Sequence, residues 1–187
     1  MQTAIYFVAA IGLLTLAYLI FRVFVRRDYR RHGRLTWYSI SLELLIFALH
    51  ANFSYLYLPA DWPALPLLPQ EHVLTATGLV FIAAGFIGVA VGMIGLGFRR
   101  VFGRDAAEIK RSGLYGLTRN PQILAYGVIM IGFAVLWSSW YALGWLMLYA
   151  AIAHLMVLTE EEHLRRLHGA AYERYCAEVP RYLPLPW

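Results

Sequence analysis

Five long apolar stretches dominate this sequence, and a chain built in this way has few possible folds. They lie at about residues 4–25, 36–58, 73–98, 121–137 and 140–158. A helix that crosses a bilayer needs roughly 20 mostly apolar residues, which the first three stretches supply and the last two nearly reach. Only Ser138 and Ser139 separate the last two, so we expect them to form a helical hairpin. The sequence therefore predicts an all-α bundle of five transmembrane helices.

The composition supports a membrane protein and excludes several other classes. Hydrophobic residues make up 60% of the chain and charged residues only 14%, whereas an ordinary soluble domain has about 25% charged residues. The single cysteine, Cys176, excludes a disulfide scaffold and fits a reducing compartment. The N-terminal residues Met1–Thr3 carry no positive charge and no cleavage site follows, so the first stretch is expected to be a span rather than a signal peptide.

The basic residues predict how the chain is oriented. All 16 Lys and Arg lie in three segments, which are Arg22, Arg26, Arg27, Arg30, Arg31 and Arg34; Arg99, Arg100, Arg104, Lys110, Arg111 and Arg119; and Arg165, Arg166, Arg174 and Arg181. Five spans place these segments on one side, which the positive-inside rule makes cytoplasmic. The opposite side carries only Asp61 and Glu71 as charges. We therefore expect a multi-pass protein of a prokaryotic cytoplasmic membrane, with its N-terminus outside and its C-terminus inside.

This distribution of charge also bears on partners and on domain organisation. The arginines are expected to contact anionic membrane lipids rather than nucleic acid. We expect one integral-membrane domain, residues 1–187. Its residues 1–98 supply three spans, and residues 99–187 supply a loop, the hairpin and a cytoplasmic C-terminal helix.

Four glycines lie on one face of the third stretch, because their spacing fits the helical repeat. They are Gly85, Gly88, Gly92 and Gly95. Close helix packing is the favoured interpretation. The alternatives are a bare face for a flat ligand, or a dimer contact through Gly88 and Gly92, so the oligomeric state stays open.

Ionisable residues inside spans are costly and are functional candidates by default. Glu43 lies about 10 Å inside the second stretch, and His154 lies about 6–9 Å inside the fifth, at 1.5 Å per residue. The two side chains are therefore expected to meet at one depth, either as catalytic groups or as a polar pair that fixes helix register. His50 lies deeper and is expected to pack in the core.

Two polar segments flank the hairpin. In the first, Pro121 suits the first turn of a helix, with Asn120 as its N-cap, and Arg119 is either a lipid-headgroup anchor or an anion site. In the second, Thr159 and Glu162 match the capping box of a new helix.

The same tail carries two further features. Glu160 and Glu161 sit at the membrane edge, where a carboxylate can hold a cationic ligand or sugar hydroxyls. An apolar stripe is expected to fold the tail back onto the bundle or the bilayer; it consists of Leu164, Ala171, Tyr172, Tyr175 and Val179.

Several short motifs in the second half of the chain share the order and spacing of a known superfamily. They are Gly113-Leu114-Tyr115, Arg119-Asn120-Pro121, a hairpin of about forty residues, Glu160-Glu161-x-x-Leu164, Gly169-x-x-Tyr172-x-x-Tyr175 and Val179-Pro180. Over about residues 100–184 the chain resembles the isoprenylcysteine carboxyl methyltransferase and phospholipid methyltransferase superfamily.

The resemblance implies S-adenosylmethionine as cofactor, bound on the cytoplasmic side between the hairpin and the tail. It implies cofactor contacts at Arg100, Ala107, Glu108, Ile109, Lys110, Tyr115, Asn120, Pro121, Gln122, Ile123 and Glu160. Glu160 can bind the cofactor's hydroxyls or ammonium, Tyr115 can stack on adenine or face the sulfonium, and Lys110 can meet the carboxylate. Methyl transfer is an in-line displacement, so positioning should dominate the rate enhancement.

The sequence departs from the superfamily pattern at three positions. Asn120 replaces the usual histidine, Ile123 replaces an aromatic residue, and Met156 stands where the prenylcysteine enzymes carry a carboxylate-binding arginine. The last change argues against a prenylcysteine carboxylate as acceptor. An amine or thiol acceptor must lose a proton, which Glu43 or His154 could take. Together with Arg119 they are the candidate catalytic residues.

The leading hypothesis is an integral-membrane methyltransferase that acts on a lipidic or membrane-partitioned acceptor, which enters laterally between helices. The first alternative is a membrane reductase of the sterol-reductase type that uses NADPH. The second is a non-catalytic helical membrane protein. The sequence indicates no metal site and leaves open whether O, N or S is methylated.

Overall fold

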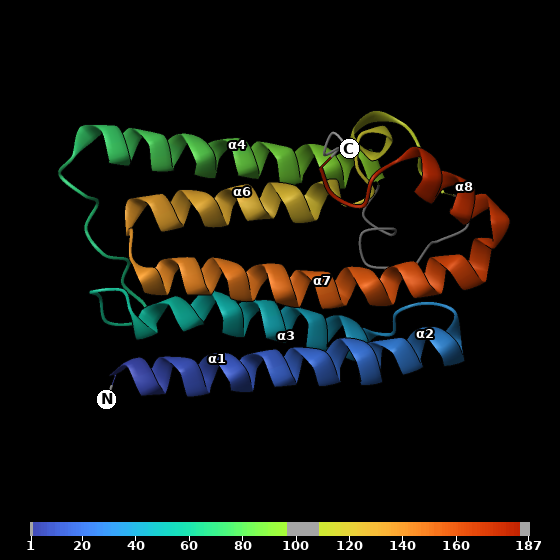
Figure 1. Cartoon of the computed structure of the whole chain (residues 1–187), viewed down its shortest axis with the longest axis horizontal. Helices are drawn as coiled ribbons and strands as arrows, with labels where there is room; N and C mark the ends of the chain where they lie inside the picture. The colour runs from blue at the N-terminus through green and yellow to red at the C-terminus, as the bar shows by residue number, and fades with distance from the viewer. Residues whose placement is uncertain (1, 97–108, 184–187) are drawn as a thin grey trace.

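The computed structural model describes residues 2–96 and 109–183, and within these ranges it contains helices and no strand. The long helices are α1 (Gln2–Tyr18), α3 (Trp37–Phe53), α4 (His72–Leu96), α6 (Pro121–Leu136) and α7 (Trp140–His168). They run side by side along the long axis of the molecule (Figure 1). In the described ranges, four apolar helical stretches are long enough to cross a membrane, and α6 is a shorter apolar helix. The predicted all-α membrane bundle is therefore confirmed.

The first helical stretch extends beyond the expected boundary at residue 25. After α1 the backbone passes through a π-helical segment, Leu19–Val25, and continues as α2, Arg26–His32. Four of the arginines between the first two apolar stretches are therefore helical, namely Arg26, Arg27, Arg30 and Arg31. Gly33 ends this stretch with φ +66°, a left-handed conformation that favours glycine.

The glycine face of α4 packs against α6, which is its closest neighbour in the bundle. A Cβ atom added at Gly85 would lie 2.5 Å from Ile129 Cγ1 and 2.7 Å from the carbonyl oxygen of Ala125. Added at Gly88 or Gly92, it would lie 2.9 Å from a side chain of α6. Close packing is thus confirmed for these three glycines, and α6 covers the face that a ligand or dimer partner would have used. Gly95 is different, because a Cβ there meets nothing within 4 Å.

Helices α6 and α7 form the expected hairpin, and each begins at the expected residue. Pro121 occupies the first turn of α6, and Ser139 caps α7 by accepting a hydrogen bond from the Ala142 amide at 3.0 Å. Asn120 holds the N-cap position, but its side chain makes no capping hydrogen bond.

The prediction that a new helix begins at Thr159 is wrong. Helix α7 continues without a break to His168, and Thr159 Oγ1 lies 2.9 Å from the carbonyl oxygen of Leu155 one turn earlier. The change from apolar to polar residues marks where the surroundings of the helix change. The backbone hydrogen bonds of the helix continue across that point, so it is not a helix end. The tail turns only at Gly169, which precedes the short helix α8 (Ala170–Glu178).

The tail folds back on the end of the bundle, as its apolar stripe predicts. Tyr172, Tyr175 and Val179 are buried together, and Ile109 and Leu164 pack against them. In Figure 1, α8 lies at the same end as α2 and the segment before α6, while the N-terminus and the α3–α4 connection lie at the other end. The three basic segments, as far as they are described, therefore share one end of the molecule.

His50 fulfils its expected role in the core. It is fully buried, its Nε2 lies 3.0 Å from the carbonyl oxygen of Trp145, and the indole N–H of Trp145 donates to the carbonyl oxygen of His50 at 2.8 Å. The two rings stack with an interplanar angle of 3°. This reciprocal pair joins α3 to α7.

Candidate functional site

Three consecutive glutamates of α7 organise the basic end of the molecule. Successive residues of a helix point about 100° apart, so Glu160, Glu161 and Glu162 face three different parts of the fold. Each glutamate has its own neighbours, and these neighbours decide whether its carboxylate is already paired or is available to a ligand.

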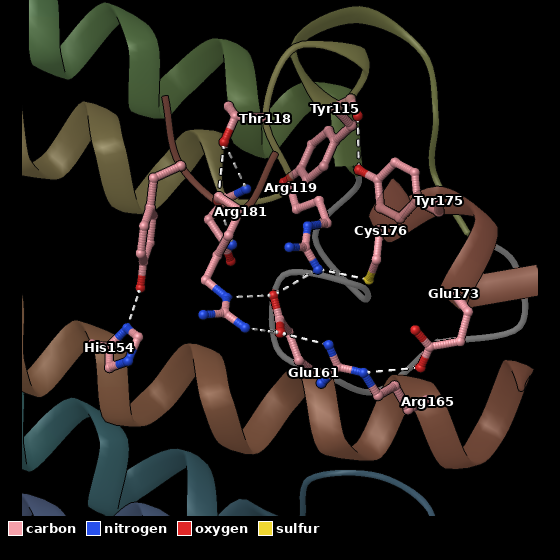
Figure 2. A network of polar contacts seen from close by, with 12 residues as sticks. Tyr115, Thr118, Arg119, His154, Glu161, Arg165, Glu173, Tyr175, Cys176 and Arg181 are labelled. Carbon is pink, nitrogen blue, oxygen red and sulfur yellow. Dashed lines mark hydrogen bonds and ion pairs between the residues drawn. The ribbon is translucent and has the colours of Figure 1, made fainter. Parts of the chain in front are cut away.

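Glu161 faces the tail and the segment before α6. Its side chain is only 2% exposed and lies 2.9 Å from Arg119 Nη1. Arg181 grips the same carboxylate with two contacts, Nε to Oε1 at 3.0 Å and Nη2 to Oε2 at 2.8 Å, and Arg165 lies 3.3 Å away. Figure 2 shows these guanidinium groups converging on Glu161. The hydrogen-bonded carboxylate raises the pKa of Arg181 above its usual value. Glu161 is therefore a structural anion.

Glu162 faces the N-terminal helices. Its carboxylate lies 2.8 Å from Arg26 Nε, 2.9 Å from Arg30 Nη2 and 3.5 Å from Arg22 Nη2. These contacts join α7 to the end of the first helical stretch. This glutamate too is engaged within the protein.

Glu160 faces a different environment, in which carboxylates and phenols gather. It is close enough to Glu43 of α3 and to Tyr29 of α2 for their charges to interact. The hydroxyl of Tyr115 belongs to the same group, because burial and then the charge of Glu160 raise the pKa of that phenol. Between the described residues, no hydrogen bond or ion pair involves the carboxylate of Glu160 or Glu43. Both side chains keep partial exposure, so a ligand can reach them.

Two buried polar groups beside this region lack a hydrogen-bond partner in the described part of the chain. They are the hydroxyl of Tyr115 and the amide nitrogen of Gln122. A buried polar group without a partner costs roughly 1–3 kcal/mol. Tyr115 belongs to the short 3₁₀ helix Gly113–Gly116, and Gln122 belongs to the first turn of α6. The Tyr115 hydroxyl, whose charge interacts with that of Glu160, can bind a polar ligand, and the Gln122 amide is a second unused donor, at the start of α6.

The backbone on either side of these groups is held firmly. The hydroxyl of Tyr149 donates to the carbonyl oxygen of Ile123 at 2.7 Å. Likewise, the hydroxyl of Tyr175 donates to the carbonyl oxygen of Tyr115 at 2.7 Å, and the side-chain amide of Asn120 donates to the carbonyl oxygen of Arg181 at 2.9 Å. Of the segment from Tyr115 to Ile123, Tyr115 lies close enough to Glu160 for their charges to interact; that this segment and Glu160 share one cofactor site stays a prediction.

The expected meeting of Glu43 and His154 does not occur. His154 Nδ1 lies 2.9 Å from the hydroxyl of Tyr182 in the tail, whereas Glu43 is near Glu160. The six residues from His154 to Glu160 turn the helix by about 600°, so the two side chains point about 120° apart. Only one of them can face Glu43, and the structure assigns that direction to Glu160.

Several further candidates can now be placed. Arg119 binds Glu161, and its Nη1 also lies 2.7 Å from Cys176 Sγ, so the anion beside it is internal. Ile109 packs in the tail cluster, and Lys110 is half-buried. Arg100, Ala107 and Glu108 lie outside the described residues.

Sequence reasoning missed Arg165, Cys176 and Arg181 as parts of this site. Arg165 lies one helical turn after Glu161, a local spacing that could have indicated the pair. The contacts of Cys176 with Arg119 and of Arg181 with Glu161 join separate segments, which no local spacing indicates. The expectation that there is no metal site stays a prediction, although the described residues contain no group of three His, Cys, Asp or Glu that could hold an ion.

Together, the bundle and its basic end define an integral-membrane helical protein with a candidate ligand site beside its helical hairpin. A family model, phospholipid methyltransferase, matches residues 73–171, which is more than half of the chain. The protein therefore belongs to the phospholipid methyltransferase family, a family of membrane methyltransferases. In the same comparisons, no curated protein and no solved structure matched the chain.

Proposed function

We propose that this protein transfers a methyl group from S-adenosylmethionine to a lipidic or membrane-partitioned acceptor, with the cofactor bound at the basic, cytoplasmic end. Family membership supports the reaction class. The observation that carries the proposal is local: the unpartnered hydroxyl of Tyr115, the unpartnered amide of Gln122 and the carboxylate of Glu160 belong to the segments that the resemblance assigns to the cofactor.

The residues present fit such a cofactor. Glu160 can accept hydrogen bonds from ribose hydroxyls or pair with an ammonium group, because no described residue neutralises it. The Tyr115 hydroxyl and the Gln122 amide are donors, and the half-buried Lys110 can meet a carboxylate. When bound, S-adenosylmethionine supplies a methyl group on a positively charged sulfur. The protein's own contribution is to orient the two reactants and to exclude water.

The residues on the proposed acceptor side of the site, Met156 and Glu43, favour an acceptor group that must lose a proton when it is methylated. Met156 lies one turn before Glu160 on α7 and offers no charge to an anionic acceptor. Glu43 approaches from α3 and can take a proton from an amine or a thiol. His154, held by Tyr182, is the second candidate base, and Arg119 acts by fixing Glu161. Glu43 lies on the membrane-spanning helix α3 and is partly exposed, so an acceptor dissolved in the membrane would approach it laterally.

Calorimetric titration of detergent-purified protein with S-adenosylhomocysteine tests the proposal. Saturable binding is expected for the wild type, and Glu160→Gln should weaken it at least about 10-fold through loss of a charge-assisted hydrogen bond. Glu162→Gln is the matched control, because it neutralises a carboxylate two residues further along α7 that contacts only arginines of the protein. It should leave binding within about 2-fold.

Three outcomes would contradict the proposal. Binding of NADPH without binding of the homocysteine product would favour a reductase. Folded wild-type protein that binds neither nucleotide would favour a non-catalytic role. Equal effects of the two glutamine substitutions would remove Glu160 from the cofactor site.

A further inference from the structure

The three tail residues Pro180–Tyr182 cross the site as a strap, and we use this name for them below. The carbonyl oxygen of Pro180 accepts a hydrogen bond from the Arg119 amide at 3.0 Å. The carbonyl oxygen of Arg181 accepts from Thr118 Oγ1 at 3.2 Å and from Asn120 Nδ2 at 2.9 Å. The strap therefore binds the three residues that lead directly into α6.

The side chains of the strap reach the other wall of the site, which is helix α7. Arg181 makes its two-pronged contact with Glu161, and the hydroxyl of Tyr182 contacts His154 Nδ1 at 2.9 Å. Figure 2 shows Arg181 between Thr118 above and Glu161 below. Through its backbone and its side chain, this single residue joins the segment before α6 to α7.

The geometry points to Arg181 as a positioning residue for cofactor binding, an inference that rests on the proposed function. Tyr115 and Gln122 come from the α6 side, and Glu160 comes from α7. A ligand that contacts all three requires a fixed distance and rotation between those two elements. Arg181 fixes them, because Glu161 follows Glu160 directly and Asn120 precedes Gln122 by two residues.

Charge balance leads us to expect that Arg181 can be replaced without unfolding the protein. Glu161 retains Arg119 at 2.9 Å and Arg165 at 3.3 Å when Arg181 is removed. The carboxylate then stays paired, and no isolated buried charge remains. What the substitution removes is the alignment of α7 with the segment before α6. A guanidinium that makes two parallel contacts fixes the orientation of its partner, whereas a point charge does not.

Titration of S-adenosylhomocysteine into Arg181→Met, Arg181→Lys and wild-type protein tests the inference. Arg181→Met should weaken binding about 10-fold or more, and Arg181→Lys should restore part of the affinity, since it keeps the charge without the two-pronged contact. The thermal midpoint of each variant should stay within a few degrees of the wild type.

Arg111→Met is the matched control. Arg111 also ties the segment before α6 to the tail, with Nη1 2.9 Å from Glu178 Oε2 and Nη2 3.1 Å from the carbonyl oxygen of Ala171. This ion pair is exposed and does not touch Glu161. The substitution should therefore leave binding within about 2-fold.

The outcomes separate this inference from the proposed function. Wild-type protein that does not bind the probe overturns both. Normal binding by Arg181→Met overturns the positioning role alone, and so does an equal loss in Arg111→Met, which would show that docking of the tail as a whole matters. If Arg181→Met does not fold, the affinity of Arg181→Lys decides: a value equal to that of the wild type overturns the role.

Discussion

At the scale of single residues, neighbours of the same chemical type have different roles because helix geometry separates them. Glu161 is surrounded by guanidinium groups and cannot serve a ligand. Glu160, one residue earlier, faces Glu43 and two tyrosines and remains available. Of the three consecutive glutamates, two are therefore structural anions, and Glu160 is the one we propose as a ligand-binding group.

Tyr115→Phe should separate ligand binding from stability. Its hydroxyl is buried and without a partner in the described chain, so its removal should leave the thermal midpoint unchanged or raise it, since about 1–3 kcal/mol of desolvation cost disappears. Affinity for S-adenosylhomocysteine should fall several-fold. Unfolding followed by circular dichroism and calorimetric titration measure the two effects. Tyr175→Phe is the contrasting variant, because it removes a hydrogen bond of 2.7 Å and should lower the midpoint.

The sequence indicated some of these residues and not others, for a physical reason. Tyr115, Gln122 and Glu160 lie in short motifs whose spacing is local, so the resemblance reaches them. Two partners of Glu161, Arg119 and Arg181, come from other segments of the chain, and Arg181 is brought to it only by the return of the tail. Pairing between side chains twenty or more residues apart depends on tertiary structure that spacing does not encode.

At the scale of elements, the contact between α4 and α6 depends on glycine. Gly85→Ala should destabilise the bundle by about 1–3 kcal/mol, because the new Cβ would lie 2.7 Å from the Ala125 carbonyl oxygen and 2.8 Å from the Ile129 amide nitrogen. Gly95→Ala is the control on the same helix, where the added Cβ meets nothing within 4 Å. That variant should be neutral or slightly stabilising. Thermal unfolding in detergent measures both, and equal midpoints would refute the packing argument.

The sequence predicted the number and order of the apolar elements well, but it misplaced two of their ends. Hydropathy locates where a helix enters the apolar part of the membrane, whereas Gly33 and Gly169 locate where the backbone stops being helical. Both helices therefore project beyond their apolar stretches. In these projections, Glu162 of α7 pairs with Arg26 and Arg30 of α2, and the two ion pairs hold the basic end together.

At the scale of the whole molecule, the arrangement divides the chain into a basic end that carries the candidate site and an opposite end that carries Asp61 and Glu71. A soluble cofactor would reach the basic end from water, and a lipidic acceptor would reach Glu43 through the bundle. Such a division requires one fixed orientation in the membrane. The positive-inside rule predicts that the basic end lies in the cytoplasm.

Labelling of single cysteines tests this orientation. Cys176 is the only cysteine of the chain, so Cys176→Ala provides a background into which Asp61→Cys or Arg174→Cys is introduced. Both positions are exposed. Asp61 belongs to the α3–α4 connection and Arg174 to α8, and these two elements lie at opposite ends in Figure 1. In right-side-out vesicles a membrane-impermeant maleimide should label Asp61→Cys at once and Arg174→Cys only after the membrane is opened. The reverse pattern would place the candidate site on the outer side, where a cytoplasmic cofactor cannot reach it, and would contradict the proposed reaction along with the orientation.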